Sequence, residues 1–177
     1  EMTPTLARMA TAHTRNYKKP IKWFSIPQLF RYERQQKGRL REHFQLNADI
    51  LGEENWAADA ELIALLIDTL RDLKLTSDDF VIRLSSRRAW QDFFENGGVQ
   101  ESGTYDFYQI VDKLDREDPA VSGDKLAKLG FSLEQVNDFI ESGQPTDELA
   151  AIIGNIEARG LGDFIKIDYR IIRGLAY

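Results

Sequence analysis

The sequence predicts an α+β fold in which a run of short helices is inserted into a sheet-containing core. Alternating apolar and polar residues, which are typical of strands, occur near both ends of the chain. Apolar residues at helical spacing dominate the middle. We therefore expect a first core segment over residues 1–85, a helical insertion over 86–162 and a return strand within 163–177.

The core begins with a helix. Thr3 can cap its first free amides, Pro4 suits the first helical position, and Pro20 ends the segment. Helical spacing relates Leu6, Met9, Ala10, His13 and Tyr17. Because His13 lies on this apolar stripe, we interpret it as a packed or edge histidine and not as a catalyst.

Residues 29–52 predict a β-hairpin, which follows a strand over residues 21–26. Successive side chains of a strand point to opposite faces, so the hairpin has one apolar and one polar face. The apolar face carries Phe44, Leu46, Ala48 and Ile50. The polar face carries Arg31, Glu33, His43, Gln45 and Asp49. Such a face suits a small polar ligand, although a salt-bridged outer face of a sheet gives the same pattern.

The loop of this hairpin concentrates positive charge in a chain whose formal net charge is −6. Five cations fall within eleven residues: Arg31, Arg34, Lys37, Arg39 and Arg41. Cations gathered against the overall charge indicate an anionic partner, either a phosphate chain or a nucleic acid. Neither GxxxxGKS/T nor GxGxxG occurs, so the planar forks of arginine side chains would have to hold any phosphates.

Further elements connect the hairpin to the insertion. Asn55 can cap a helix that extends to Leu70, residues 80–84 form a strand, and Ser86 begins a helix that ends near Gly97. A second basic group, which we interpret as a solvated or salt-bridged face, consists of Arg83, Arg87 and Arg88.

The insertion consists of short helices. An apolar stripe runs from Phe107 to Leu114, Ser132 and Gln135 form a capping box, and Thr146 can cap a third helix. Alternation typical of a strand then returns over residues 166–172. A sheet that is left near residue 85 and rejoined near 166 implies that the helices are inserted into the core.

Composition excludes several classes of protein. The chain of 177 residues has 42% apolar and 29% charged residues, and no apolar run approaches the roughly 20 residues of a membrane helix. The absence of cysteine excludes disulfides and thiolate chemistry, and two histidines are too few for a zinc site. We expect a cytoplasmic protein without a membrane partner. Because Glu1 precedes Met2, we interpret the chain as a piece of a longer protein.

Three segments resemble motifs of the histidyl-tRNA synthetases, which are class II aminoacyl-tRNA synthetases. Residues 30–45 (FRYERQQKGRLREHFQ) are similar to motif 2 of that family. Residues 1–8 (EMTPTLAR) are similar to its histidine-binding segment, and residues 173–177 (RGLAY) to the start of its histidine-specific motif. The resemblance spans the whole chain. It implies an antiparallel sheet flanked by helices, with a small helical insertion domain.

The resemblance also implies a reaction and its ATP-binding residues. Histidine and ATP would form histidyl-adenylate, and the histidyl group would pass to tRNA(His), with Mg²⁺ bridging the outer phosphates. Arg31 and Arg173 would be catalytic, on opposite sides of the α-phosphate. Glu33 would contact the adenine amino group, Arg39 the outer phosphates, and His43 would stack on adenine.

For histidine, the resemblance implies a second set of residues. The carboxylate would lie on Arg31, and Asp49 would accept the imidazole N–H. The remaining histidine-binding residues would be Glu1, Met2, Thr3, Gln45, Arg173 and Tyr177. The resemblance further implies a homodimer for the full-length enzyme. The chain lacks most of the dimer-forming motif, motif 3 and the anticodon-binding domain, so the piece alone is not assured of dimerising or catalysing.

Four positions depart from the family pattern. Gln35 replaces a proline, Ala176 a common aspartate, and His43 an aromatic residue, while Asp49 is one methylene shorter than the usual glutamate. None of these changes removes an arginine. Two alternatives stay open: a non-catalytic paralogue that has a regulatory role, and an RNA-binding module that uses the basic loop.

Overall fold

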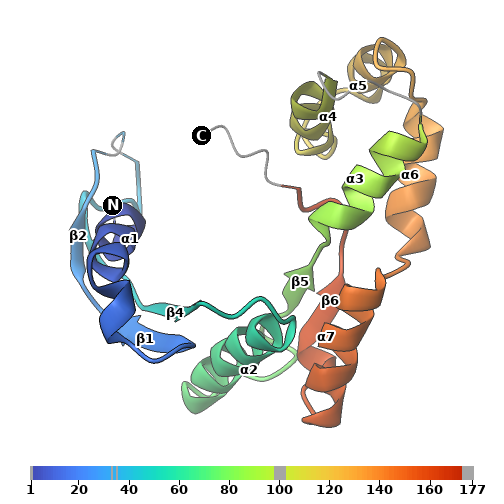
Figure 1. The fold of residues 1–177 in the computed structure, drawn as a ribbon. Helices are drawn as coiled ribbons and strands as arrows, with labels where there is room; N and C mark the ends of the chain where they lie inside the picture. Colours follow the sequence, from blue (N-terminus) through green and yellow to red (C-terminus); the bar gives the residue numbers. More distant parts are fainter. Residues whose placement is uncertain (1, 33, 35, 98–102, 173–177) are drawn as a thin grey trace. The chain divides into compact units, whose positions relative to one another are not determined.

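The computed structural model describes residues 2–32, 34, 36–97 and 103–172. The chain divides into two compact units, an N-terminal unit (Glu1–Ala58) and a C-terminal unit (Asp59–Tyr177). Both contain helices and strands, in agreement with the predicted α+β class (Figure 1). Within the described ranges, no helix is long and apolar enough to cross a membrane. The predicted boundaries near residues 85 and 162 stay predictions.

The N-terminal unit consists of one helix and one long hairpin. Its helical part comprises α1 (Met2–His13) and the 3-10 turn η1 (Thr14–Asn16). The strands are β1 (Ile21–Ser25), β2 (Gln28–Phe30), β3 (Glu42–Phe44) and β4 (Asn47–Leu51). Helix α1 begins at Met2, so Thr3 lies inside the helix and the predicted cap at Thr3 is wrong. Pro4 is tolerated there because the first-turn amides have no intrahelical partner.

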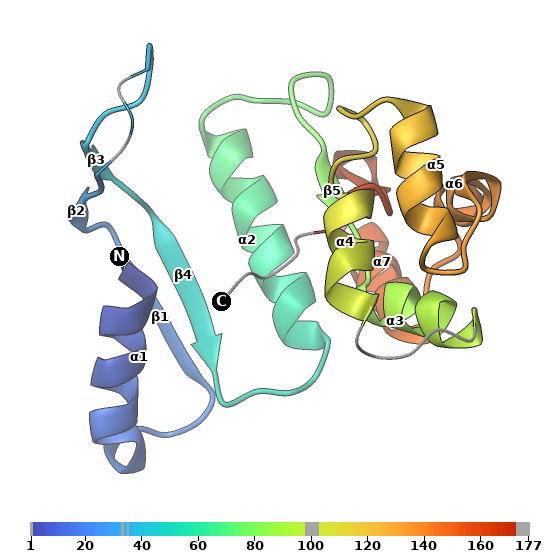
Figure 2. The same ribbon diagram turned by 90° about the horizontal axis from the view of Figure 1, so that it is seen from above.

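The strands of the hairpin pair antiparallel in one continuous register. Strand β1 pairs with β4, from Ile21 opposite Leu51 to Ser25 opposite Asn47 (Figure 2). Strand β2 pairs with β3, and the amide of Gln45 donates to the carbonyl of Pro27 at 3.3 Å between the two pairs. The predicted hairpin is therefore present. The predicted continuous second strand is wrong, because a break separates β3 from β4.

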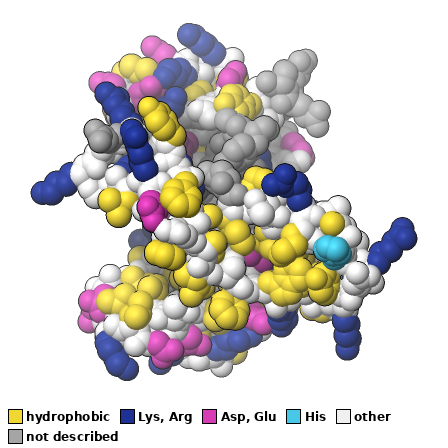
Figure 3. Space-filling model, turned by 90° about the vertical axis from the view of Figure 1, so that its left-hand side faces the viewer, with side chains coloured by type: hydrophobic (Ala, Val, Ile, Leu, Met, Phe, Trp, Pro, Cys, Tyr) yellow, Lys and Arg dark blue, Asp and Glu magenta, His cyan; other side chains and the backbone are white. Residues whose placement is uncertain are grey.

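Burial alternates strictly along the first half of the hairpin. Over residues 21–30 every odd-numbered residue is buried or half-buried, and every even-numbered one is exposed. Large apolar side chains reach the surface on the even-numbered face, namely Phe24, Ile26, Phe30, Phe44 and Leu46. Figure 3 shows hydrophobic side chains at the surface of the molecule on the side that it draws. Within this chain, the covered face is therefore the one that also carries the polar residues.

The C-terminal unit is mostly helical. Its elements are α2 (Ala57–Asp72), β5 (Ile82–Leu84), α3 (Arg87–Asn96), α4 (Thr104–Val111), α5 (Pro119–Ala127), α6 (Leu133–Ser142), α7 (Asp147–Ala158), the 3-10 turn η3 (Gly162–Phe164) and β6 (Ile165–Ile167). Strand β5 pairs with β6 in parallel, with Arg83 opposite Lys166 (Figure 1). The helices α3 to α7 lie between these two strands in the sequence. This is the order expected for helices inserted between two strands of one sheet.

Helix starts in this unit follow the predicted caps. The Oδ1 of Asn55 accepts from the amide of Ala57 at 2.9 Å. Ser86 caps α3, and Thr146 caps α7. Ser132 and Gln135 form a complete capping box at α6, in which each side chain accepts from the other's amide. These predictions are confirmed because a cap depends on a few neighbouring residues only.

The predicted antiparallel strands are present, because two of the three two-stranded pairs that the described strands form are antiparallel, and the third pair is parallel. One prediction about the strands of the C-terminal unit is wrong. Strand β6 ends at Ile167, whereas the alternation predicted a strand up to residue 172. The alternation continues past Ile167 because Tyr169 is buried against helices and not because it lies on a sheet.

An aromatic cluster forms the core of the C-terminal unit. Trp90 is fully buried at its centre, with its ring centroid 4.7 Å from that of Phe139 and 5.7 Å from that of Phe107. Phe93 stacks on Phe131 at 5.3 Å. Tyr169, which follows β6, stacks on Phe139 at 5.0 Å. The core thus joins the helices of the insertion to the segment that returns to the sheet.

A charged contact between α5 and the turn before it makes stability depend on pH. The ammonium of Lys125 donates to the carboxylate of Glu117, and this hydrogen bond, supported by Ser122, lowers the pKa of Glu117 against an opposing effect of burial. Because the pKa of Glu117 is lower in the folded state, its ionised carboxylate stabilises the fold at pH values above the ordinary pKa of a glutamate. This stabilisation is lost as the pH falls through the lowered pKa.

We therefore expect Glu117→Gln to lower the melting temperature at pH 7 and to have a much smaller effect at a pH below the lowered pKa. Thermal unfolding followed by circular dichroism across this range measures the difference. Asp115→Asn is the control, because the contact between Asp115 and the exposed Arg170 is long, at 3.9 Å. An equal effect of Glu117→Gln at both pH values would contradict the prediction.

Candidate functional site

The polar face of the hairpin is built by strand alternation. Arg31 faces Arg41, because the amide of Arg31 donates to the carbonyl of Arg41 at 2.8 Å. In the same register, Leu29 faces His43 and Trp23 faces Asp49. Residues of one parity share a face of a hairpin. The polar face accordingly carries Arg31, His43, Gln45 and Asp49, as the sequence predicts.

The loop at the end of the hairpin is a tight turn. Gln36 and Arg39 form an isolated bridge, and the amide of Arg39 donates to the carbonyl of Gln36 at 3.1 Å. Gly38 lies between them with φ +82°, a value that side chains disfavour. The side chains of Arg31 and Arg39 are exposed. Two of the predicted phosphate-binding arginines therefore lie on one solvent-facing hairpin, Arg39 in its turn and Arg31 directly after β2.

A pocket lies between α1 and the polar face of the hairpin, with a volume of about 380 Å³. Its lining includes Thr3 from the first turn of α1 and Asp49 from β4, two of the predicted histidine-binding residues. The other lining residues are Leu6, Ala7, Ala10, Thr11, Thr14, Lys19, Ile21, Leu51 and Gly52. A carboxylate and a hydroxyl beside an apolar wall suit a small ligand with one polar edge.

The structure shows the other predicted site residues outside this pocket, or does not describe them. Met2 is the first residue of α1. The side-chain amide of Gln45 donates to Oδ1 of Asn47 at 2.8 Å. Neither Met2 nor Gln45 lines this pocket. His43 is half-buried on the same face as Asp49. Four predicted residues lie outside the described residues: Glu1, Glu33, Arg173 and Tyr177.

Sequence reasoning assigned the other lining residues of this pocket, Gly52 and Lys19 among them, to no site. Gly52 has φ +81°, and a Cβ there would lie 2.8 Å from Cδ of Lys19. A side chain at position 52 would therefore be strained and would also collide with Lys19. The available signal was a glycine directly after an apolar strand, which marks a close approach of two chain segments. Nothing in the sequence indicated Lys19 as its neighbour.

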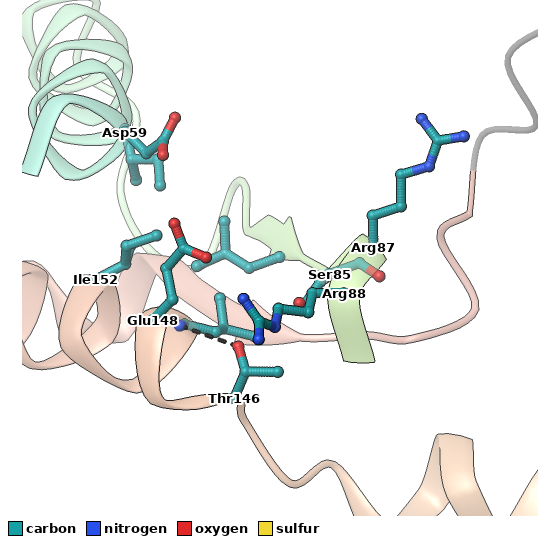
Figure 4. A pocket seen from close by; sticks show the side chains of 11 residues that line it. Asp59, Ser85, Arg87, Arg88, Thr146, Glu148 and Ile152 are labelled. Atoms are coloured by element: carbon teal, nitrogen blue, oxygen red, sulfur yellow. Dashed lines mark hydrogen bonds between the residues drawn. The ribbon is translucent and has the colours of Figure 1, made fainter. Parts of the chain in front are cut away.

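A second pocket of about 400 Å³ lies in the C-terminal unit (Figure 4). Asp59, Arg88 and Glu148 line it together with apolar residues of α2 and α7. Of the second basic group, Arg87 and Arg88 line this pocket, whereas Arg83 does not. Arg83 pairs with Asp168 at 3.1 Å, and the guanidinium of Arg87 lies 5.7 Å from the ring centroid of Tyr108. This agrees with the salt-bridged interpretation for Arg83.

A metal site made by the protein alone is not found among the described residues. They contain no group of three or more His, Cys, Asp or Glu side chains that could hold a metal ion. The described part of the hairpin carries cations, Arg31 and Arg39 among them, and a carboxylate, Asp49, farther along the same hairpin. Such a set suits a metal that arrives on phosphate oxygens, since Mg²⁺ in nucleotide sites is commonly bound by substrate phosphates together with one or two carboxylates.

Comparisons with known proteins show what the chain is similar to. A histidine–tRNA ligase of Opitutus terrae is 40% identical, over all of this chain and 46% of its own length. A histidine–tRNA ligase of Haloarcula marismortui is 36% identical, over all of this chain and 45% of its own. The crystal structure of histidyl-tRNA synthetase from Nostoc sp. shares the fold, with a TM-score of 0.81 and 22% identity, over all of this chain and 46% of that one.

A second solved structure, from Bacillus halodurans, is described as an ATP phosphoribosyltransferase regulatory subunit/histidyl-tRNA synthetase. It matches with a TM-score of 0.77 at 17% identity, over all of this chain and 50% of that one. The similarity to the histidine–tRNA ligases places the chain among the class II aminoacyl-tRNA synthetases. More narrowly, the chain belongs to the histidyl-tRNA synthetase family, whose family model matches residues 1–177. It spans less than half the length of the histidine–tRNA ligases of Opitutus terrae and Haloarcula marismortui.

Proposed function

We propose that this chain is the central part of an enzyme that activates L-histidine with ATP and transfers it to tRNA(His). The observation that carries the proposal is the polar face of the hairpin. It presents Arg31 and Arg39 at the loop, and places Asp49 in a pocket with Thr3. Cations for phosphates and a carboxylate for an imidazole therefore lie on one hairpin, as the reaction needs.

On the ATP side, Arg31 would bind the α-phosphate, and Arg39 the outer phosphates. Glu33 would accept from the adenine amino group, while His43 would stack on the base. Adenylate formation is an in-line displacement at phosphorus, which needs positioning and fixed positive charge more than a protein nucleophile. Mg²⁺, brought with the nucleotide, would neutralise part of the phosphate charge beside Arg31 and Arg39. Arginine forks suit this task because they match pairs of phosphate oxygens.

On the histidine side, Asp49 would accept the imidazole N–H, and Arg31 would hold the substrate carboxylate. Thr3 and Gln45 would contact the α-amino group, together with Glu1. Met2, Arg173 and Tyr177 would complete the site. Thr3 and Asp49 support this part of the proposal because they line one pocket, although they lie far apart in the sequence.

A regulatory paralogue without catalysis is the second candidate, because one solved neighbour is described in part as a regulatory subunit. A protein that only binds a regulator has no need for cations at the α-phosphate. This chain retains Arg31 and Arg39 in the hairpin and Arg173 in its last motif. We therefore favour the enzyme, and with it a cytoplasmic homodimer as the full-length form.

Histidine-dependent ATP–pyrophosphate exchange tests the proposal. The full-length protein and the chain of 177 residues are assayed side by side, with other amino acids as controls. Exchange by the full-length protein with histidine alone is the expected result. A folded full-length protein without exchange, but able to bind a partner enzyme, would favour the regulatory paralogue. Salt-sensitive RNA binding without exchange would favour an RNA-binding module.

Asp49→Ala is expected to raise the apparent KM for histidine in this assay about 30-fold, because a charge-assisted hydrogen bond contributes about 2 kcal/mol. The KM for ATP should change by less than about twofold, since Asp49 has no proposed contact with the nucleotide. Glu42→Ala is the matched control, because Glu42 lies on the opposite face of the same hairpin. An unchanged KM for histidine would remove Asp49 from the histidine site.

A further inference from the structure

The pocket of the C-terminal unit brings together three charged side chains from three helices (Figure 4). Asp59 lies in the first turn of α2, Arg88 in α3 and Glu148 in the first turn of α7. All of the lining residues belong to the C-terminal unit, so the pocket is formed within one compact body. Its volume of about 400 Å³ falls in the range of pockets that bind small molecules.

The three charges are not used by the fold. Asp59, Arg88 and Glu148 are exposed, and in the described part of the chain their side chains form no hydrogen bond and no ion pair. The hydrogen bond that Figure 4 draws in the pocket joins the amide of Leu149 to the hydroxyl of Thr146. A guanidinium and two carboxylates that line one space without pairing leave both signs of charge available to a ligand.

The remaining wall of the pocket is largely apolar. Leu149 and Ile152 on α7 are buried, and Ile63 on α2 and Leu84 at the end of β5 are half-buried. An apolar wall with a few charged groups is the usual lining of a pocket that binds a small ligand and fixes its orientation. The ligand should therefore combine an apolar part with a charged part.

The charges of the lining restrict what the charged part can be. Arg87 also lines the pocket, but its guanidinium points away in Figure 4 and lies 5.7 Å from the ring centroid of Tyr108. Arg88 is thus the cation that faces Asp59 and Glu148. A phosphate would bring further negative charge to the two carboxylates, and a simple amine would bring positive charge to Arg88. A ligand that carries one charge of each sign satisfies all three side chains.

We propose that this pocket binds a free α-amino acid with an aliphatic side chain. Its carboxylate accepts from the fork of Arg88, and its ammonium donates to Glu148 and Asp59. Its aliphatic side chain packs against Leu149 and Ile152. This inference goes beyond the proposed function and does not depend on it, because no residue of the hairpin lines the pocket.

Binding of leucine to the full-length protein, followed by saturation-transfer NMR, tests the proposal. We expect a dissociation constant of about 1 mM, as two charge-assisted hydrogen bonds would give. Two analogues serve as matched controls: 3-methylbutylamine, which is leucine without its carboxylate, and 4-methylpentanoate, which is leucine without its ammonium. Each should bind at least about tenfold more weakly than leucine. Equal binding of leucine and either analogue, or no binding of leucine, would overturn the proposal.

Substitutions in the full-length protein locate the bound leucine. Arg88→Gln should weaken binding at least about tenfold, since it removes the fork for the carboxylate. Arg87→Gln removes the same charge from the neighbouring residue and should leave binding unchanged, because that guanidinium lies beside Tyr108. Melting curves of both variants verify that they are folded.

Asp49→Ala distinguishes this pocket from the one beside the hairpin, because Asp49 lines only the hairpin pocket of these two. Leucine should bind this variant as it binds the unaltered protein. If leucine binding were lost in Asp49→Ala and kept in Arg88→Gln, the leucine would lie in the hairpin pocket, and the proposal would be wrong. An equal loss in Arg88→Gln and Arg87→Gln would also overturn it, since the effect would then reflect net charge alone.

Discussion

Arg173→Ala in the full-length protein is expected to lower kcat for histidine-dependent ATP–pyrophosphate exchange by about a thousandfold, the effect of removing one group that stabilises transition-state charge. The fold should be unaffected, since the preceding segment has its own anchors at Asp168 and Tyr169. Stopped assays of exchange and a melting curve of the same preparation provide the measurement.

The physical reason is the charge that develops at the α-phosphate. Arg31 would hold this phosphate and the histidine carboxylate from one side, and the hairpin fixes the backbone of Arg31 by its bond to Arg41 at 2.8 Å. Two anionic groups brought together repel each other, and one arginine cannot neutralise both. In the proposed site, the guanidinium of Arg173 would offset this repulsion in the transition state. Arg173→Lys keeps the charge but not the planar fork, so we expect an intermediate rate.

Arg170→Ala is the control for this prediction. Arg170 precedes Arg173 by three residues and is exposed, with a long contact to Asp115 at 3.9 Å. Its removal changes the net charge by the same amount and should leave exchange nearly unchanged. Near-normal turnover of Arg173→Ala, or an equal loss in Arg170→Ala, would contradict a specific role for Arg173.

The parts of the fold that depend on neighbouring residues were predictable from the sequence. Caps at Asn55, Ser86, Ser132 and Thr146 are present because each needs only the next two or three amides. The polar face of the hairpin was predictable for the same reason, since parity alone assigns Arg31, His43 and Asp49 to one side.

Features that depend on distant packing were not predictable. Alternation over residues 166–172 indicated a strand, but Tyr169 owes its burial to Trp90 and Phe139, which lie on helices. Alternation likewise indicated that Phe44 and Leu46 are covered, whereas α1 lies over the opposite face of the hairpin. The meeting of Thr3 and Asp49 in one pocket followed only from the family resemblance, because no local pattern relates α1 to β4.

Trp90→Ala is expected to give the largest loss of stability in the C-terminal unit, about 4 kcal/mol, as is usual when a large buried aromatic side chain is removed. Trp90 is fully buried and contacts the rings of Phe93, Phe107, Phe139 and Tyr169. The substitution also leaves the buried carbonyl of Tyr169 without its donor. Unfolding in urea, followed by the circular dichroism of the helices, measures the change in the free energy of unfolding.

Two further variants separate the packing of Trp90 from its hydrogen bond. Trp90→Phe retains most of the ring contacts but has no N–H for the carbonyl of Tyr169, so it should cost about 1–2 kcal/mol, the usual penalty for a lost buried hydrogen bond. Leu65→Ala removes an apolar side chain that is 48% exposed on α2, and should cost less than about 1 kcal/mol. If Trp90→Ala were no more destabilising than Leu65→Ala, the aromatic cluster could not be the core that joins the insertion to the returning chain.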